Sequence, residues 1–158
     1  AFWTILYGVV QGSAPRLLNA SSRSGDALLV QARRWAALLV LPPAALALAV
    51  LVAGPPSAAL TATIVAGLLA FGGIFAVNSS LHSYLILAFT DARRVTMDVG
   101  FYYMANAAGR LIGTLLSGLS YQTGGLGLCL GTAAAMVLVS YLGIRQVAWG
   151  ETGAAPAE

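Results

Sequence analysis

The strongest constraint on this chain is the spacing of its charges, because long apolar segments alternate with short connections that hold nearly all the arginines. Only 8% of the 158 residues are charged and 59% are apolar, whereas a soluble domain carries about 25% charged residues. Helices rise about 1.5 Å per residue, so segments of this length can cross a hydrocarbon core of about 30 Å. The composition therefore predicts an all-α, polytopic membrane protein.

Glycine, proline and charged residues divide the chain into five apolar segments, of which the first is truncated. They are 1–11, 35–53, 57–90, 99–122 and 128–144. The short first segment, which does not begin with Met, predicts a fragment cut inside a helix, with further helices before it. The segment 57–90 would run about 51 Å as a helix, so we expect it to tilt, bend near Gly72 and Gly73, or protrude. We expect one transmembrane unit over 1–144 and a polar, disordered tail over 145–158.

Arginine is the only basic residue apart from one histidine, and its distribution predicts the orientation. If all five segments cross, the connections 12–34 and 91–98 and the tail lie on one side and hold seven of the eight arginines. The connections 54–57 and 123–127 lie on the other side and hold none. The positive-inside rule then places the C-terminus in the cytoplasm. The arginines form no basic patch, so nucleic-acid binding is not expected.

The eighth arginine, Arg110, lies alone near the middle of the apolar segment 99–122. An arginine at mid-membrane costs at least about 2.5 kcal/mol to insert, and such residues face a protein interior or a water-filled path. At helical spacing one stripe gathers polar side chains around it, namely Tyr103, Asn106, Arg110, Thr114 and Ser117. A guanidinium fork matches carboxylate or phosphate, so we expect an oxyanion site. The alternative is a structural arginine that bonds helix-end carbonyls or pairs with an acid elsewhere in the protein.

Small residues recur every four positions beside this polar stripe, at Ala105, Gly109, Gly113 and Ser117. On a helix this spacing gathers them on one face, which lets another helix approach closely. We therefore expect a helix-packing face. The alternative is the general abundance of Gly and Ala in membrane helices.

A second polar cluster, NSSLHSYL at 78–85, lies inside the third apolar segment. Asn78 and His82 are four residues apart, which places them on one face of a helix. Histidine titrates near physiological pH and can donate to an oxyanion or carry a proton, so both residues are candidate substrate ligands. For His82, a core histidine bonded to a neighbouring helix is the slightly better supported interpretation.

Several chemistries lack the residues that they need. One histidine and one cysteine, Cys129, give no metal-ligand spacing and no disulfide pair. The sequence also lacks a P-loop and a pair of acids within the apolar segments. We therefore expect no enzyme activity, no cofactor and no metal.

The runs NSSLHSYLILAFTD and VGFYYMANAAGRLIGTLLSGLSYQ, with the opening FWTILYGVVQGSAPRLL, resemble a known family. The sequence is similar to the C-terminal part of a major facilitator superfamily transporter of the organoarsenical efflux (ArsJ-type) family, over about residues 1–121. The resemblance implies the twelve-helix fold, with helices 8 to 12 present here. It also implies efflux of the arsenate ester 1-arseno-3-phosphoglycerate, made by a glyceraldehyde-3-phosphate dehydrogenase. Such an antiporter would lie in the inner (plasma) membrane, use the proton gradient and contribute to arsenate resistance.

The candidate residues fit that ligand in kind. Arg110, Asn106 and Tyr103, with Asn78 and His82, can bind the oxygens of a pentavalent oxyanion, whereas trivalent arsenic needs a thiolate cluster that one cysteine cannot supply. Two other functions stay open: transport of another organic anion, such as a sugar phosphate or carboxylate, and a non-transporting membrane scaffold or truncated remnant. The expected partners are the small anion, the lipid bilayer and the missing N-terminal half of the same protein.

Overall fold

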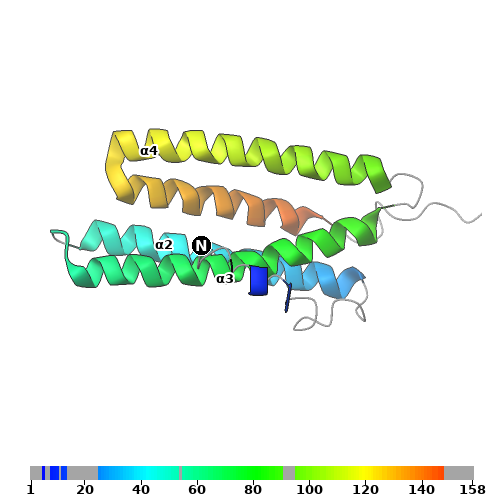
Figure 1. Ribbon diagram of the computed structural model, residues 1–158, viewed down its shortest axis with the longest axis horizontal. Coiled ribbons are helices and arrows are strands. Elements are labelled where there is room, and N and C mark those ends of the chain that lie inside the picture. Colours follow the sequence, from blue (N-terminus) through cyan, green and yellow to red (C-terminus); the bar gives the residue numbers. More distant parts are fainter. Residues whose placement is uncertain are drawn as a thin grey trace, which may run out of the picture.

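Three long helices account for most of the structure, which is a computed structural model (Figure 1). They are α2 (Gly25–Val52), α3 (Ala58–Phe89) and α4 (Val95–Gln146). The structure describes residues 5, 8–10, 12–13, 25–53, 55–90 and 95–147. All three helices are long and apolar enough to cross a membrane, and the described residues contain no strand. The prediction of an all-α protein is thus confirmed for this part of the chain, and its helices have the length and apolar composition that crossing a membrane requires.

The start of α2 differs from the predicted segment boundary at residue 35. The helix begins at Gly25, inside the predicted polar connection 12–34, and carries Arg33 and Arg34 within it. The prediction followed charge alone, whereas the helix is fixed by apolar residues before those arginines, of which Leu28 is only 4% exposed. Arginines are compatible with a helix end, because their long side chains can reach the polar surface.

α3 is helical throughout the third apolar segment, including Gly72 and Gly73. It begins after Ser57, whose side-chain oxygen accepts a hydrogen bond from the Leu60 amide at 3.2 Å and so caps the helix. Its 32 residues correspond to about 48 Å, which exceeds the thickness of the hydrocarbon core. The helix must therefore tilt or protrude, as the length of the segment predicts.

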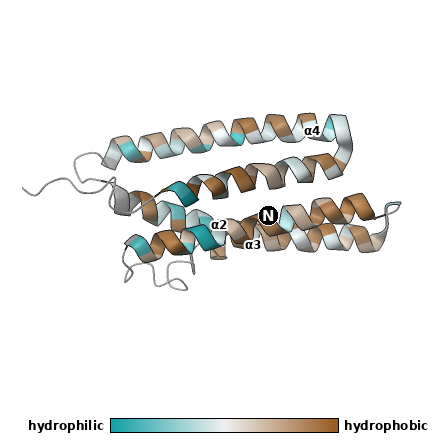
Figure 2. Cartoon of the chain, turned by 180° about the vertical axis from the view of Figure 1, so that it is seen from behind, coloured by the Kyte–Doolittle hydropathy of each residue, from teal (hydrophilic) through white to brown (hydrophobic). Residues whose placement is uncertain are grey.

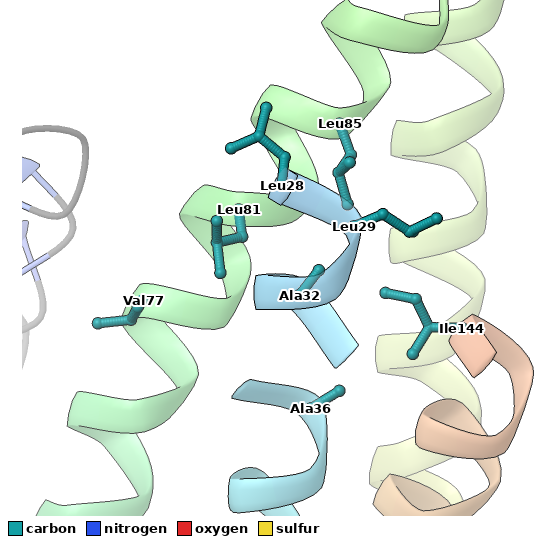
Figure 3. Close-up of a cluster of buried hydrophobic side chains, with 8 residues drawn as sticks. All are labelled: Leu28, Leu29, Ala32, Ala36, Val77, Leu81, Leu85 and Ile144. Atoms are coloured by element: carbon teal, nitrogen blue, oxygen red, sulfur yellow. The ribbon is translucent and has the colours of Figure 1, made fainter. Parts of the chain in front are cut away.

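α2 and α3 form an antiparallel pair whose seam holds most of the buried side chains. Near the α2 N-terminus, leucine and alanine side chains interdigitate with Val77, Leu81 and Leu85 of α3, and Ile144 of α4 completes the cluster (Figure 3). Toward the other end, Leu46 approaches α3 so closely that a Cβ atom at Gly67 would lie 2.6 Å from its Cδ2. Gly67 therefore permits the close approach of the two helices.

α4 contains 52 residues, which as one straight helix would measure about 78 Å. Instead it reverses at Gly124 and Gly125, where the backbone leaves helical geometry, and the two halves run side by side (Figure 1). Gly125 has φ 65° and ψ −159°, a combination open essentially to glycine. We call 95–123 the first arm and 126–146 the second arm. The reversal lies within the connection 123–127 that the sequence predicts as a turn.

The second arm is the inner one, since it packs against α2, whereas α3 and α4 share few contacts. Leu130 packs in the cluster of Leu46 and Ala47. Ile144 packs in the cluster near the α2 N-terminus. The first arm lies outside it, with hydrophilic positions scattered along its length (Figure 2). Most of its side chains are exposed, so this arm contributes little to the core.

Candidate functional site: a groove on the outer arm

Arg110 lies on the first arm of α4, about 22 Å along the helix from its start at Val95 and about 21 Å from the turn at Gly124. The arginine is thus near the middle of an arm that is long enough to span a membrane. The side chain is exposed, as are the neighbouring Leu111 and Ile112. In a bilayer this position is at the depth where an unpaired charge costs most.

An open groove of about 360 Å³ follows the arm beside Arg110. The described residues that line it all come from this one helix: Tyr102, Ala105, Asn106, Gly109 and Arg110. Small side chains at two of these positions create the hollow, while the others supply an aromatic ring, an amide and a guanidinium. The groove is therefore an open and mostly apolar concavity that carries a few polar groups, formed on one helix that the rest of the described chain leaves open.

The described hydrogen bonds near the groove do not involve the guanidinium. Asn106 Nδ2 makes a long contact of 3.5 Å with the Tyr102 carbonyl oxygen, and Thr114 Oγ1 donates to the Arg110 carbonyl oxygen at 2.8 Å. Both interactions use the backbone of the same helix. Within the described ranges, no hydrogen bond or ion pair engages the Arg110 side chain. Its donors are available to a ligand or to an element outside those ranges.

The predicted polar stripe is only partly gathered in this groove. Arg110 and Asn106 line it, but Tyr103 is 67% exposed and does not. Tyr102 takes that place, with its ring centroid 5.5 Å from that of Tyr103. The signal for Tyr102 was present in the sequence, because it precedes Asn106 by four residues and so shares its face.

The small-residue face is mostly uncovered. A Cβ atom at Gly109 or Gly113 would meet nothing within 4 Å, and Ala105 is exposed. Ser117, at the end of this row, lies 3.3 Å from Cys129 Sγ on the second arm. Packing of another helix on Ala105, Gly109 and Gly113 therefore stays a prediction, while Ser117 takes part in the contact between the two arms.

Asn78 and His82 lie on α3 and do not line the Arg110 groove. Asn78 is 9% exposed, and its Oδ1 atom is buried without a hydrogen-bond partner. A ring nitrogen of His82, Nδ1, lies 2.9 Å from the Asn78 carbonyl oxygen, so this nitrogen contacts the backbone of its own helix. A role for either residue in binding substrate stays a prediction.

The two arms of α4 are held together by small polar side chains. Ser120 Oγ donates to Thr132 Oγ1 at 2.9 Å, and Ser117 contacts Cys129 as described above. Cys129 thus has a structural contact that its sequence surroundings did not indicate. Within the described part of the chain, no group of three or more His, Cys, Asp or Glu side chains could hold a metal ion.

Comparison with other proteins identifies no relative. No protein-family model, no curated protein and no solved structure matches this chain.

Proposed function

We propose that this chain is part of a membrane transporter for a small organic anion and that Arg110 binds the charge of the anion. One observation carries the proposal: the guanidinium lies at the middle of an apolar arm, lines a groove, and has no partner among the described residues. An arginine at that depth is costly unless it faces a water-filled path or another charge. A transported anion would supply the countercharge to Arg110 while it is bound.

The open side of the groove suggests how the transporter is completed. All described lining residues belong to one arm, so a closed binding site needs a second wall from other transmembrane helices. We propose that these helices are the remaining part of a major facilitator-type protein, as the resemblance implies. Alternating access would then rock the two halves around a site near mid-membrane, with the proton gradient as the energy source.

The groove chemistry suits a phosphate-like oxyanion. Arg110 can donate two parallel hydrogen bonds to it, Asn106 Nδ2 can donate another, and the Tyr102 hydroxyl is a further donor. A volume of about 360 Å³ lies at the lower end of the range for small-molecule sites, about 300–1,000 Å³. We propose the arsenate ester 1-arseno-3-phosphoglycerate as the ligand, which makes a glyceraldehyde-3-phosphate dehydrogenase the functional partner.

The decisive experiment uses arsenic-sensitive bacterial cells that express the dehydrogenase together with the complete protein that contains this chain. Arsenate resistance and cellular arsenic are compared for the wild type, Arg110→Lys and Arg34→Lys at matched membrane expression. Lysine keeps the charge but loses the planar fork, so Arg110→Lys is expected to lose protection. Arg34 is exposed near the helix end, so Arg34→Lys serves as the matched control and should protect like the wild type.

Two results would redirect the assignment. If the wild type gives no protection, the arsenical is wrong, and uptake of labelled sugar phosphates and carboxylates into vesicles becomes the test of the broader anion proposal. If Arg110→Lys reduces membrane expression instead of transport, Arg110 is a structural residue and the scaffold alternative gains support.

A further inference from the structure

Three arginines of the described chain gather at one end of the bundle, where the start of α2 meets the end of α4. They are Arg33, Arg34 and Arg145, and we call them the arginine end. The geometry is fixed by contacts between the two helices. Arg33 Nε donates to the Ile144 carbonyl oxygen at 3.4 Å, and Arg33 Nη2 donates to the Val147 carbonyl oxygen. Arg145 follows Ile144 directly, so its backbone lies next to the Arg33 side chain.

The contacts of Arg33 are typical of a basic group at a helix C-terminus. The last carbonyls of a helix have no partner within it and carry partial negative charge, which a guanidinium satisfies. These two bonds use two of the five guanidinium N–H groups. Arg33 is half-buried, so its remaining N–H groups are held in a fixed position at the edge of the seam.

The other two arginines extend this positive surface. Arg145 lies over the ring of Tyr141, with Cζ 5.8 Å from the centroid, and its side chain is exposed. Arg34 is also exposed and lies about 100° around α2 from Arg33. Neither of the described acids, Asp26 and Asp98, forms an ion pair with these arginines in the described part of the chain. The positive charges therefore lack a countercharge there.

Exposed apolar residues lie directly beside these charges, toward the middle of the bundle. Leu38 follows Arg34 by four residues and is 43% exposed, and Leu142 precedes Arg145 by three and is 45% exposed. Tyr141, beneath Arg145, is the kind of residue that anchors helices at the membrane interface. A surface with cations at the interfacial end and leucines next to them matches a phospholipid, which has a charged head and apolar chains.

We propose that the arginine end binds the phosphate of an anionic glycerophospholipid such as phosphatidylglycerol. Arg33 and Arg145 hold the phosphate at the α2–α4 seam, Arg34 adds charge from the neighbouring face, and the acyl chains lie against the exposed leucines. Basic residues near an anionic membrane surface contribute roughly the equivalent of a five-fold change in association each, which corresponds to about 1 kcal/mol. This site is separate from the Arg110 groove and does not depend on the transported substrate.

The test places a fluorescent probe beside the site in the full chain. Leu142→Trp is introduced where the three natural tryptophans are replaced by phenylalanine, and the protein is reconstituted in vesicles of phosphatidylcholine. Brominated phosphatidylglycerol or brominated phosphatidylcholine is then added at equal mole fraction, and quenching gives the relative association of each lipid. We expect a preference for phosphatidylglycerol of more than about five-fold, which Arg145→Gln lowers about five-fold.

Arg110→Gln is the matched control, because it removes the same charge from the middle of the first arm and should leave the preference unchanged. If Arg145→Gln fails to fold, the wild type alone gives the answer, since high salt should abolish a preference that depends on exposed charges. Equal quenching by the two lipids in the wild type would overturn the proposal. Inorganic phosphate that displaces phosphatidylglycerol far better than chloride does at the same ionic strength would also overturn it, in favour of a site for a soluble anion.

Discussion

The α2–α3 seam and the first arm of α4 are both long apolar helices, yet they are used in opposite ways. In the seam, leucine and alanine side chains are buried, and Leu81 and Ala32 are 0% exposed. On the first arm, Leu111 and Leu115 are each 64% exposed, and the arm is attached to its neighbour through serine, threonine and cysteine. Hydropathy alone does not distinguish the two regions.

The difference shows which helix faces are already covered by neighbouring helices. In lipid, apolar surface gives little drive for helices to associate, so packing and hydrogen bonds decide which faces come together. The seam already has interdigitating side chains and a glycine contact. The first arm has an exposed row of small residues and an exposed arginine, and both features are more stable when another helix or a ligand covers them. The Arg110 groove thus lies on the region that the core leaves open.

The largest expected difference between the two regions comes from matched leucine truncations. Leu81→Ala should lower the free energy of unfolding in detergent by about 2–3 kcal/mol, since it leaves a cavity in the seam. The value lies near the low end of the range for soluble cores, because a membrane environment reduces the cost of exposing apolar surface. Leu111→Ala on the first arm should change it by less than about 0.5 kcal/mol. Equal losses for the two variants would show that the arm is packed after all.

A substitution at Gly125 tests whether the reversal between the two arms of α4 requires a glycine backbone conformation. Gly125→Ala forces a side chain into a conformation with φ 65°, so we expect a loss of about 1–2 kcal/mol, measured by denaturant titration in detergent. Gly131→Ala is the control, because a Cβ atom there meets nothing within 4 Å and the residue lies within the second arm. A Gly125→Ala protein as stable as the control would contradict this turn geometry.

The close approach of α2 and α3 is tested by a second glycine pair. Gly67→Ala would place a Cβ atom within 3 Å of three Leu46 side-chain atoms, so it should lower the melting temperature and the free energy of unfolding by about 1 kcal/mol or more. Gly73→Ala, on the same helix but in open space, should be neutral or slightly stabilising. The double variant Gly67→Ala, Leu46→Ala should recover part of the loss. If it does not, the clash is not the cause.

The smallest effect is expected at the hydroxyl contacts between the arms. Ser120→Ala removes the bond to Thr132, which for membrane helices amounts to about 0.6 kcal/mol. The single cysteine provides a sensitive measurement, because Cys129 lies between the same two arms, in contact with Ser117, and is only half-exposed. Ser120→Ala should increase the rate at which a thiol reagent labels Cys129, whereas Ser140→Ala, on an exposed position of the second arm, should not.

The helices and the reversal at the glycines were predictable because they follow from local rules. Apolar length gave the helices, and a run of glycines between two apolar segments gave the turn at Gly124 and Gly125. The start of α2 was not predictable from charge, since Arg33 bonds carbonyls of a helix more than 100 residues later. A contact of that kind exists only after the tertiary fold is formed, so no local pattern signals it.

The candidate site was predictable in type but not in detail. Arg110 and Asn106 were identified from spacing, and both line the groove. Tyr102 was missed because two adjacent tyrosines can occupy the stripe, although Tyr102 precedes Asn106 by four residues and so shares its face. The surroundings of Asn78 and His82 were also beyond the sequence, because they depend on which face of α3 the neighbouring helices cover.

The Arg33 contact sets an order of events during synthesis. The arginine emerges from the ribosome early, whereas the carbonyl groups that it binds belong to residues 111 and 114 positions further along. At about 5–20 residues per second, that interval is on the order of 5–20 s. During this interval the guanidinium must be hydrogen-bonded to water, lipid headgroups or the insertion machinery. The N-terminal part of α2 can therefore reach its final structure only after the second arm has entered the membrane.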